Sequence, residues 1–130
     1  MPSHRRGWAM RGGRRSQDRH TPLTISLLEP ALLVLLKEQP RHGYPLLADL
    51  EALGMSTIHP SVVYRTLREM EGLEWITSDW DTEQTQGPPR RVYRLTDLGE
   101  DVLQTWQQEL EKSRDMISQL MNRISNLERR

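Results

Sequence analysis

The sequence predicts a mainly α-helical fold with one small β-hairpin. Two observations indicate this class. Apolar residues recur at the three- and four-residue spacing of helices in four stretches, which lie at about residues 24–38, 44–53, 59–73 and 96–130. Only residues 74–95 show the two-residue alternation that is typical of strands. Because the chain has 130 residues, we expect a single domain.

The composition excludes several classes of protein. The chain has no Cys, so we expect no disulfide framework, no thiolate nucleophile and no Cys-ligated zinc. No apolar run approaches the roughly 18 residues of a membrane span, and the N-terminus lacks the apolar core of a signal peptide. The sequence also lacks a phosphate-cradling Gly loop and a His–carboxylate cluster with metal-ligand spacing. We therefore expect no enzyme, no metal, no cofactor and no membrane association.

The first 21 residues form an Arg- and Gly-rich arm. Residues 1–20 contain six Arg and a single Asp, so their net charge is +5, and the remainder of this neutral chain nets −5. With almost nothing to bury, residues 1–21 are expected to be disordered. The arm either contacts the phosphates or minor groove of DNA or only keeps the chain soluble. Its two histidines, His4 and His20, make a poor metal site.

Residues 24–38 are the most apolar stretch. Six leucines leave this helix little polar face, so it must be covered on several sides. Pro30 is tolerated in a first turn, which places the start of the helix near Glu29. In so small a chain we expect part of the cover to come from a second copy, with Leu32 and Leu36 at the interface.

Two short helices follow, joined by a tight turn. Residues 39–43 break the first pattern, and residues 44–53 carry four leucines that we expect on an inner face, Leu46, Leu47, Leu50 and Leu53. Gly54 ends this helix, and the turn leads into residues 59–73. A helix, a short turn and a second helix offer the second helix to a DNA groove while the first braces it.

The helix at residues 59–73 has two different faces. Pro60 suits its first position and Gly72 its end. An apolar stripe is made by Val63, Leu67 and Met70. A polar stripe without carboxylates is made by Ser61, Tyr64, Arg65 and Arg68. Such a polar face fits a major groove; the alternative is an ordinary solvated surface helix.

Residues 74–95 predict a β-hairpin, or wing. Residues 74–81 and 90–95 alternate as strands, and the loop between them contains Gly87 and two prolines. Arg90 and Arg91 begin the returning strand, where they could reach phosphates or the minor groove. The alternative is that they pair with the acidic residues of the outgoing strand and its end, which are Asp79, Asp81 and Glu83.

The remaining residues predict one long helix capped by Thr96. Its apolar residues are spaced alternately three and four apart, as in a coiled-coil seam with one polar Ser113. We expect this seam to form a homodimer interface, made by Leu103, Trp106, Leu110, Ile117, Leu120, Ile124 and Leu127. The alternative is a helix that folds back on its own domain.

These elements together make a winged helix-turn-helix with a long C-terminal dimerisation helix. We divide the chain into an arm at 1–21, a DNA-binding domain at 22–95 and a dimerisation helix at 96–130. In order and spacing the chain resembles the PadR family of bacterial transcriptional regulators. The residues that carry this resemblance are HGY at 42–44, PSVVYRTLR at 60–68, EGL at 71–73 and PRRVYRLTDLG at 89–99. SDWDT followed by GPPRRVY resembles the branch that includes polyhydroxybutyrate-responsive repressors.

The resemblance implies a cytoplasmic, nucleoid-associated homodimer that binds double-stranded operator DNA in promoters and represses transcription. A small hydrophobic or aromatic effector, bound near the dimer interface, would release the DNA, and Trp106 and Trp8 are candidates to contact it. The implied DNA-binding residues are His42, Tyr44, Ser61, Tyr64, Arg65, Arg68, Arg90 and Arg91. The wing tip departs from the family's Gly-Arg-Pro-like pattern, because it reads Gly-Pro-Pro and lacks an Arg. The rival hypothesis is a protein-interaction module that uses the Leu-rich helices and the seam.

Overall fold

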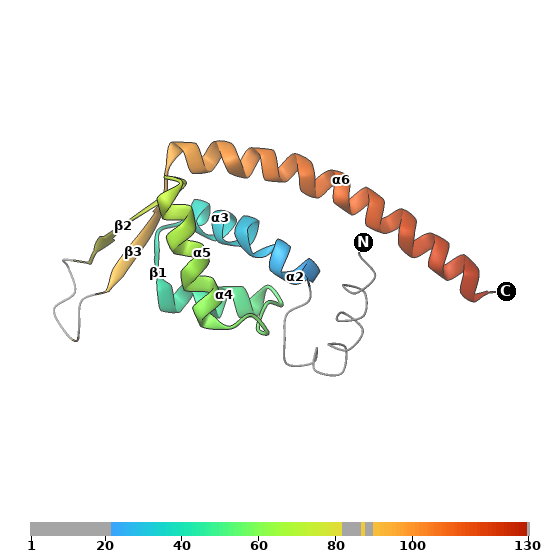
Figure 1. The fold of residues 1–130 in the computed structure, drawn as a ribbon, viewed down its shortest axis with the longest axis horizontal. Coiled ribbons are helices and arrows are strands. Elements are labelled where there is room, and N and C mark those ends of the chain that lie inside the picture. The colour runs from blue at the N-terminus through green and yellow to red at the C-terminus, as the bar shows by residue number, and fades with distance from the viewer. Residues whose placement is uncertain (1–21, 82–86, 88–89, 130) are drawn as a thin grey trace, which may run out of the picture.

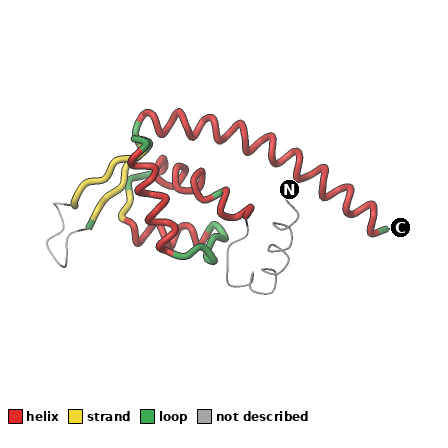
Figure 2. Tube along the Cα trace, in the orientation of Figure 1, coloured by secondary structure: helices red, strands yellow, loops and turns green. Residues whose placement is uncertain are grey.

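The computed structural model describes residues 22–81, 87 and 90–129. It confirms the mainly helical fold with a small antiparallel sheet and a long C-terminal helix (Figures 1 and 2). The elements are α2 (Pro22–Ser26), α3 (Leu28–Glu38), β1 (Arg41–His42), α4 (Gly43–Ala52), α5 (Pro60–Gly72), β2 (Ile76–Trp80), β3 (Arg91–Leu95) and α6 (Asp97–Glu128). The arm at 1–21, with Trp8, lies outside the described residues.

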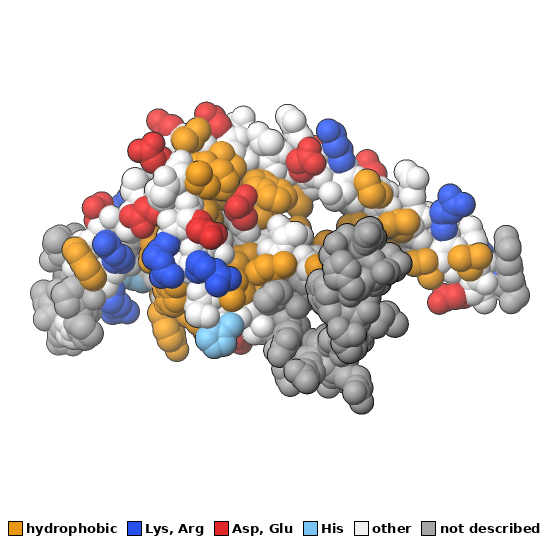
Figure 3. Space-filling model, in the orientation of Figure 1, with side chains coloured by type: hydrophobic (Ala, Val, Ile, Leu, Met, Phe, Trp, Pro, Cys, Tyr) orange, Lys and Arg blue, Asp and Glu red, His pale blue; other side chains and the backbone are white. Residues whose placement is uncertain are grey.

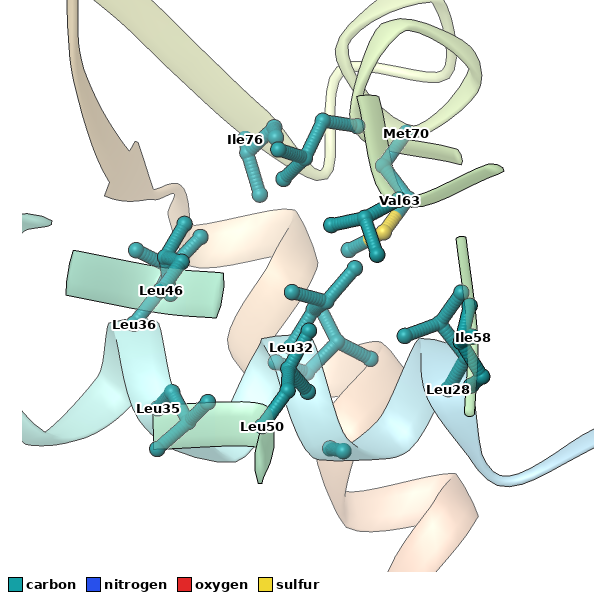
Figure 4. Close-up of a cluster of buried hydrophobic side chains, with 13 residues drawn as sticks. Leu28, Leu32, Leu35, Leu36, Leu46, Leu50, Ile58, Val63, Met70 and Ile76 are labelled. Atoms are coloured by element: carbon teal, nitrogen blue, oxygen red, sulfur yellow. The ribbon is translucent and has the colours of Figure 1, made fainter. Parts of the chain in front are cut away.

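The core forms around α3, which packs against α4, the sheet and α6. Leucines from α3 meet side chains of α4 and α5 in one buried cluster (Figure 4). Leu32 and Leu36, which we expected at a dimer interface, are only 0% and 3% exposed within a single chain. That expectation needs correction, because the chain itself covers this helix. Val34 is the one exposed apolar residue of α3, with 39% of its surface exposed.

Helices α4 and α5 form the predicted helix-turn-helix. Leu46 and Leu50 are buried as expected, but Leu53 follows the end of α4 and is 55% exposed. Gly54 has a φ of 90°, and the N–H groups of Gly54 and Met55 donate to the carbonyls of Glu51 and Leu50. This hydrogen-bond pattern closes a helix end by using a left-handed residue. Glycine suits position 54 because it adopts this left-handed conformation without steric cost.

The end of α5 uses the same pattern without a glycine. Helix α5 ends at Gly72 as predicted, and the left-handed residue that follows it is Glu74, with a φ of 67°. The N–H groups of Glu74 and Trp75 donate to the carbonyls of Glu71 and Met70. The chain thereby turns sharply from α5 into the first strand of the wing.

The sheet has three strands in the order β1-β3-β2, all antiparallel. The expected hairpin is β2 with β3, in which Trp80 lies opposite Arg91 and Ser78 opposite Tyr93. The third strand was not expected, because residues 39–43 were interpreted only as a break. Arg41 and His42 pair with Tyr93 and Val92. This short strand joins the start of α4 directly to the wing.

Helix α6 begins at an N-cap residue, Thr96, and extends beyond the rest of the domain. The Thr96 hydroxyl accepts a hydrogen bond from the Gly99 N–H at 3.0 Å, as an N-cap should. Gly99 is buried, and a Cβ there would lie 2.1 Å from the Trp75 carbonyl oxygen. At about 1.5 Å per residue, the 32 residues of α6 extend roughly 48 Å. Figure 1 shows its C-terminal half continuing beyond α2 and α3.

Candidate nucleic-acid interface

The polar stripe of α5 faces solvent, while its apolar stripe faces the core. Val63, Leu67 and Met70 are 1%, 0% and 1% exposed. On the other side, Arg65 and Arg68 are exposed. Among the described residues, neither arginine takes part in an ion pair with a carboxylate. Both guanidinium groups are therefore available to an anionic or hydrogen-bonding ligand.

The N-terminus of α5 is capped by an imidazole. His59 Nδ1 accepts a hydrogen bond from the Ser61 N–H at 3.1 Å and lies 2.9 Å from the Ser61 hydroxyl. Pro60 occupies the first position of the helix and has no N–H to satisfy. Sequence reasoning missed this cap, because His is not among the residues preferred at that position. The cap fixes the direction in which α5 leaves the preceding turn.

A hollow of about 260 Å³ lies between the start of α4, helix α5 and strand β3. Its lining residues are His42, Gly43, Tyr44, Tyr64, Arg90, Arg91 and Tyr93. Five of the eight predicted DNA-binding residues meet here. The other three, Ser61, Arg65 and Arg68, lie on α5 outside the hollow. The hollow thus brings together residues that are separated by up to 51 positions in the sequence.

The start of α4 forms one wall of this hollow. Gly43 is the first residue of α4, where unpaired backbone N–H groups and the helix dipole favour an anion. A Cβ at Gly43 would lie 2.7 Å from Cε1 of Tyr64. Glycine therefore allows the Tyr64 ring to lie directly against the helix start. Tyr44 is 76% exposed and projects toward solvent beside it.

The wing is attached to the helix-turn-helix by polar contacts. His42 Nε2 lies 2.9 Å from Asp81 Oδ2, so the acid at the end of the outgoing strand pairs with the start of α4. Ser78 donates to Glu71 Oε2 at 2.7 Å, which joins β2 to α5. The sequence suggested the wing arginines as partners of Asp81. It did not predict the contact between His42 and Asp81, because it did not predict β1.

Tyr93 is a further residue of the hollow that sequence reasoning did not select. Burial raises the pKa of its phenol, and the negative charge of Glu71 adds to this shift, whereas Arg91 and Arg68 oppose it. The Tyr93 hydroxyl is thus available as a hydrogen-bond donor in the hollow. The sequence predicted the strand that contains Tyr93, but nothing in it placed Tyr93 beside Tyr64.

The charged side chains are unevenly distributed over the surface. Figure 3 shows Lys and Arg side chains grouped over α5 and the strands, while Asp and Glu side chains gather along the first part of α6. The described residues contain no group of three or more His, Cys, Asp or Glu that could hold a metal ion. The grouping of Lys and Arg over α5 and the strands favours an anionic ligand at this surface.

The family is decided by a match over residues 32–105 to the model described as the transcriptional regulator PadR-like family. This match spans more than half of the 130 residues. The chain belongs to the PadR-like family. Its members are transcriptional regulators and not enzymes, so this protein is a DNA-binding regulator with a winged helix-turn-helix. No curated protein sequence matches the chain.

Solved structures of PadR-family regulators are similar over most of their length. One from Eggerthella lenta is 29% identical, with a TM-score of 0.67 over 76% of this chain and 85% of that chain. One from Bacillus cereus is 22% identical, with a TM-score of 0.70 over 78% and 97%. One from Clostridium difficile is 24% identical, with a TM-score of 0.64 over 73% and 98%. The last two support the shared PadR fold alone.

The PadR-like chain has a second hollow, remote from the first. It measures about 500 Å³, lies between α3 and α6 and is lined by Val34, Leu103, Gln107, Leu110, Glu111 and Arg114. Trp106 does not line it. The Trp106 ring is half-buried, and its Nε1–H donates to Glu29 Oε1 at 2.9 Å.

No helix among the described residues is long and apolar enough to cross a membrane.

Proposed function

We propose that this PadR-like regulator is a homodimeric repressor that recognises a pseudo-palindromic operator. The observation that carries this proposal is the continuous surface formed by the exposed face of α5 and the hollow beside the wing. Each α5 would enter a major groove, with the two half-sites about one helical turn, or roughly 34 Å, apart.

The eight candidate residues divide into two roles by position. Arg65 and Arg68 are exposed on α5, so we assign them to base edges, where a guanine contact contributes roughly 1–3 kcal/mol of discrimination. Ser61 and Tyr64, on the same helix, are assigned to phosphates. The remaining four surround the start of α4 and the base of the wing, where we place the adjoining phosphate backbone, and they are His42, Tyr44, Arg90 and Arg91.

The second half of α6 supports the dimer proposal. Ile117, Leu120, Ile124 and Leu127 are 40%, 55%, 54% and 61% exposed, and they continue the seam at coiled-coil spacing. The first half of the seam, Leu103, Trp106 and Leu110, is half-buried within the chain. We therefore assign residues 96–130 to dimerisation and residues 22–95 to DNA binding, with the arm at 1–21 lying near the bound duplex.

The hollow between α3 and α6 supports the proposal of an effector. Its apolar lining of Val34, Leu103 and Leu110, with Gln107 and a charged residue of each sign, suits a hydrophobic or aromatic molecule that carries a polar group. Because the hollow adjoins the proposed dimer helix, a ligand there would change the spacing of the two α5 helices. Such a change would release the operator.

The proposal is tested by fluorescence titration of the purified protein with DNA from upstream of its own gene and with a scrambled duplex, each at two salt concentrations. We expect tighter binding to the upstream DNA and a steep loss of affinity at the higher salt. Equal affinity for both duplexes would contradict sequence-specific recognition. Absence of binding at low salt would favour the rival hypothesis of a protein-interaction module.

The recognition helix is tested separately. Arg65→Ala or Arg68→Ala is expected to abolish the preference for upstream DNA while the dimer, measured by sedimentation, stays intact. Arg123→Ala removes the same charge from the exposed surface of α6 and is the matched control. If both recognition-helix variants retain the preference of the wild type, α5 does not read the bases.

A further inference from the structure

An arginine of the wing lies on the ring of a tryptophan. Trp80 and Arg91 are directly opposite each other on β2 and β3. The guanidinium carbon of Arg91 lies 4.6 Å from the centroid of the Trp80 ring. This distance is within the range of a cation–π interaction, for which Trp is the strongest of the aromatic partners. The Trp80 side chain is nevertheless 57% exposed, so it is not part of the hydrophobic core.

The pair lies on the face of the wing that meets α5. Directly opposed residues of an antiparallel pair share a face, and alternate pairs share the same one. Trp80 with Arg91 is therefore on the same side as Ser78 with Tyr93, and Ser78 bonds to Glu71 of α5. The pair thus borders the hollow between wing and helix, and Arg91 lines that hollow.

The Trp80 ring attracts the guanidinium of Arg91 through its π face and leaves the charge of the group without a carboxylate partner. The five N–H groups of an arginine lie in the guanidinium plane. Among the described residues, no carboxylate forms an ion pair with Arg91. Arg91 therefore keeps its charge and its hydrogen-bonding edge available.

Arg41 shows the contrast. Its Nη1 donates to the Leu35 carbonyl at 2.6 Å, and it forms ion pairs with Glu38 at 3.0 Å and Asp49 at 3.3 Å. Its side chain is only 12% exposed. The Arg41 guanidinium therefore links α3, β1 and α4. The Arg91 guanidinium contacts the Trp80 ring instead, and Arg91 remains exposed.

We propose that Trp80 is a positioning residue for DNA binding, which holds the guanidinium of Arg91 ready to contact a phosphate beside the recognition helix. This inference rests on the proposed function, and it goes beyond it by assigning a role to a residue that does not itself touch DNA. By restricting the Arg91 side chain before DNA arrives, the ring lowers the entropy lost on binding.

The inference is tested by a double-mutant cycle of the full chain on a labelled duplex from upstream of its own gene, titrated at several salt concentrations. We expect Arg91→Ala to reduce the slope of log affinity against log salt by about 1. Trp80→Ala is expected to weaken binding about two- to fivefold, which is the effect of an exposed cation–π pair. In the Arg91→Ala background, Trp80→Ala should cause no further loss.

Two controls separate positioning from general damage to the wing. Arg94→Ala removes the same charge from the same strand, but Arg94 pairs with Thr77 and lies on the opposite face, so the salt slope should stay at the wild-type value. Trp80→Phe keeps an aromatic face and should restore affinity to within about twofold of the wild type. The thermal unfolding of Trp80→Ala should match that of the wild type, since the side chain is exposed.

Three outcomes would overturn the inference, and each has a different meaning. If Trp80→Ala weakens binding equally with and without Arg91, the ring contacts DNA by itself. If Arg91→Ala leaves affinity and salt slope unchanged while Arg65→Ala abolishes operator preference, the wing assignment is wrong and the proposed function stands. If the wild type binds neither upstream nor scrambled DNA, the proposed function fails together with the inference.

Discussion

Helices α5 and α6 carry the same kind of apolar stripe, but the stripe of α5 is buried and that of the second half of α6 is exposed. In α5, Leu67 is 0% exposed and Met70 is 1% exposed. In the second half of α6, Leu120 is 55% exposed and Leu127 is 61% exposed. Helical periodicity shows that a face is to be covered. It does not show whether the cover comes from the same chain.

The difference arises from length and position. The 13 residues of α5 are flanked by α4 and β2, so its whole stripe meets neighbours within the domain. The 32 residues of α6 begin on the domain, where Lys37 and Glu100 pair at 2.6 Å and α3 packs alongside. Beyond Leu110 every described residue of α6 is exposed. An exposed stripe of this kind is typical of an interaction surface.

The largest effect is expected in the buried stripe. Leu67→Ala should lower the free energy of unfolding by about 2–5 kcal/mol, because it leaves a cavity in a closely packed core. Leu120→Ala is the matched control in the exposed stripe. At a single protein concentration, it should change the unfolding of the DNA-binding domain far less. Chemical denaturation followed by circular dichroism measures both, and equal losses would contradict the distinction between the two helices.

The second effect concerns the exposed stripe. Ile124→Asp would place two carboxylates in the dimer seam, and we expect this to cost on the order of 3 kcal/mol, or about a hundredfold in the dimer dissociation constant. Sedimentation should then report the 15.2 kDa of a single chain with its helical content retained. Asn122→Asp adds the same charge beside the stripe and should leave the dimer intact. A dimeric Ile124→Asp variant would rule out this seam as the interface.

A smaller effect is expected at the contact between α6 and α3. Trp106→Phe preserves an aromatic ring but loses the 2.9 Å hydrogen bond to Glu29, so we expect a loss of about 1 kcal/mol in unfolding free energy. Glu29→Gln retains an acceptor oxygen and should lose less. An unchanged melting temperature for Trp106→Phe would show that the hydrogen bond to Glu29 does not help to hold α6 against α3.

The smallest effect is expected at the start of α5. His59→Ala removes the acceptor that caps Ser61 N–H at 3.1 Å, and we expect a loss of about 0.5–1 kcal/mol in unfolding free energy. His59→Asn supplies another capping side chain and should be close to the wild type. Calorimetry of the three proteins measures the difference. If Asn is as damaging as Ala, the imidazole does more than cap the helix.

Much of the interface followed from local pattern and from the family resemblance. The spacing of Arg65 and Arg68 against Leu67 placed both arginines on the outer face of α5, because that spacing alone defines helix faces. The resemblance selected His42 and Tyr44. Neither source predicted β1 or the His42–Asp81 contact, which joins residues 39 positions apart.

The wing illustrates the same limit. The alternation at 90–95 identified a strand and the faces of its side chains. It could not give the register that sets Trp80 against Arg91, because register depends on the turn and on the buried face of the sheet. The left-handed residue after α5 could not be predicted either, since only the path of the chain into β2 places it at Glu74.

The sequence by itself determined the helical class, the two different faces of α5 and the long apolar stripe of α6, because each depends on the periodicity of neighbouring residues. The tertiary structure decided that Leu32 and Leu36 are covered within one chain and that half of the α6 stripe is left uncovered. It also decided that α4, α5 and the wing share one hollow. These are contacts between distant segments, whose geometry is set by how the whole chain packs and not by any local pattern.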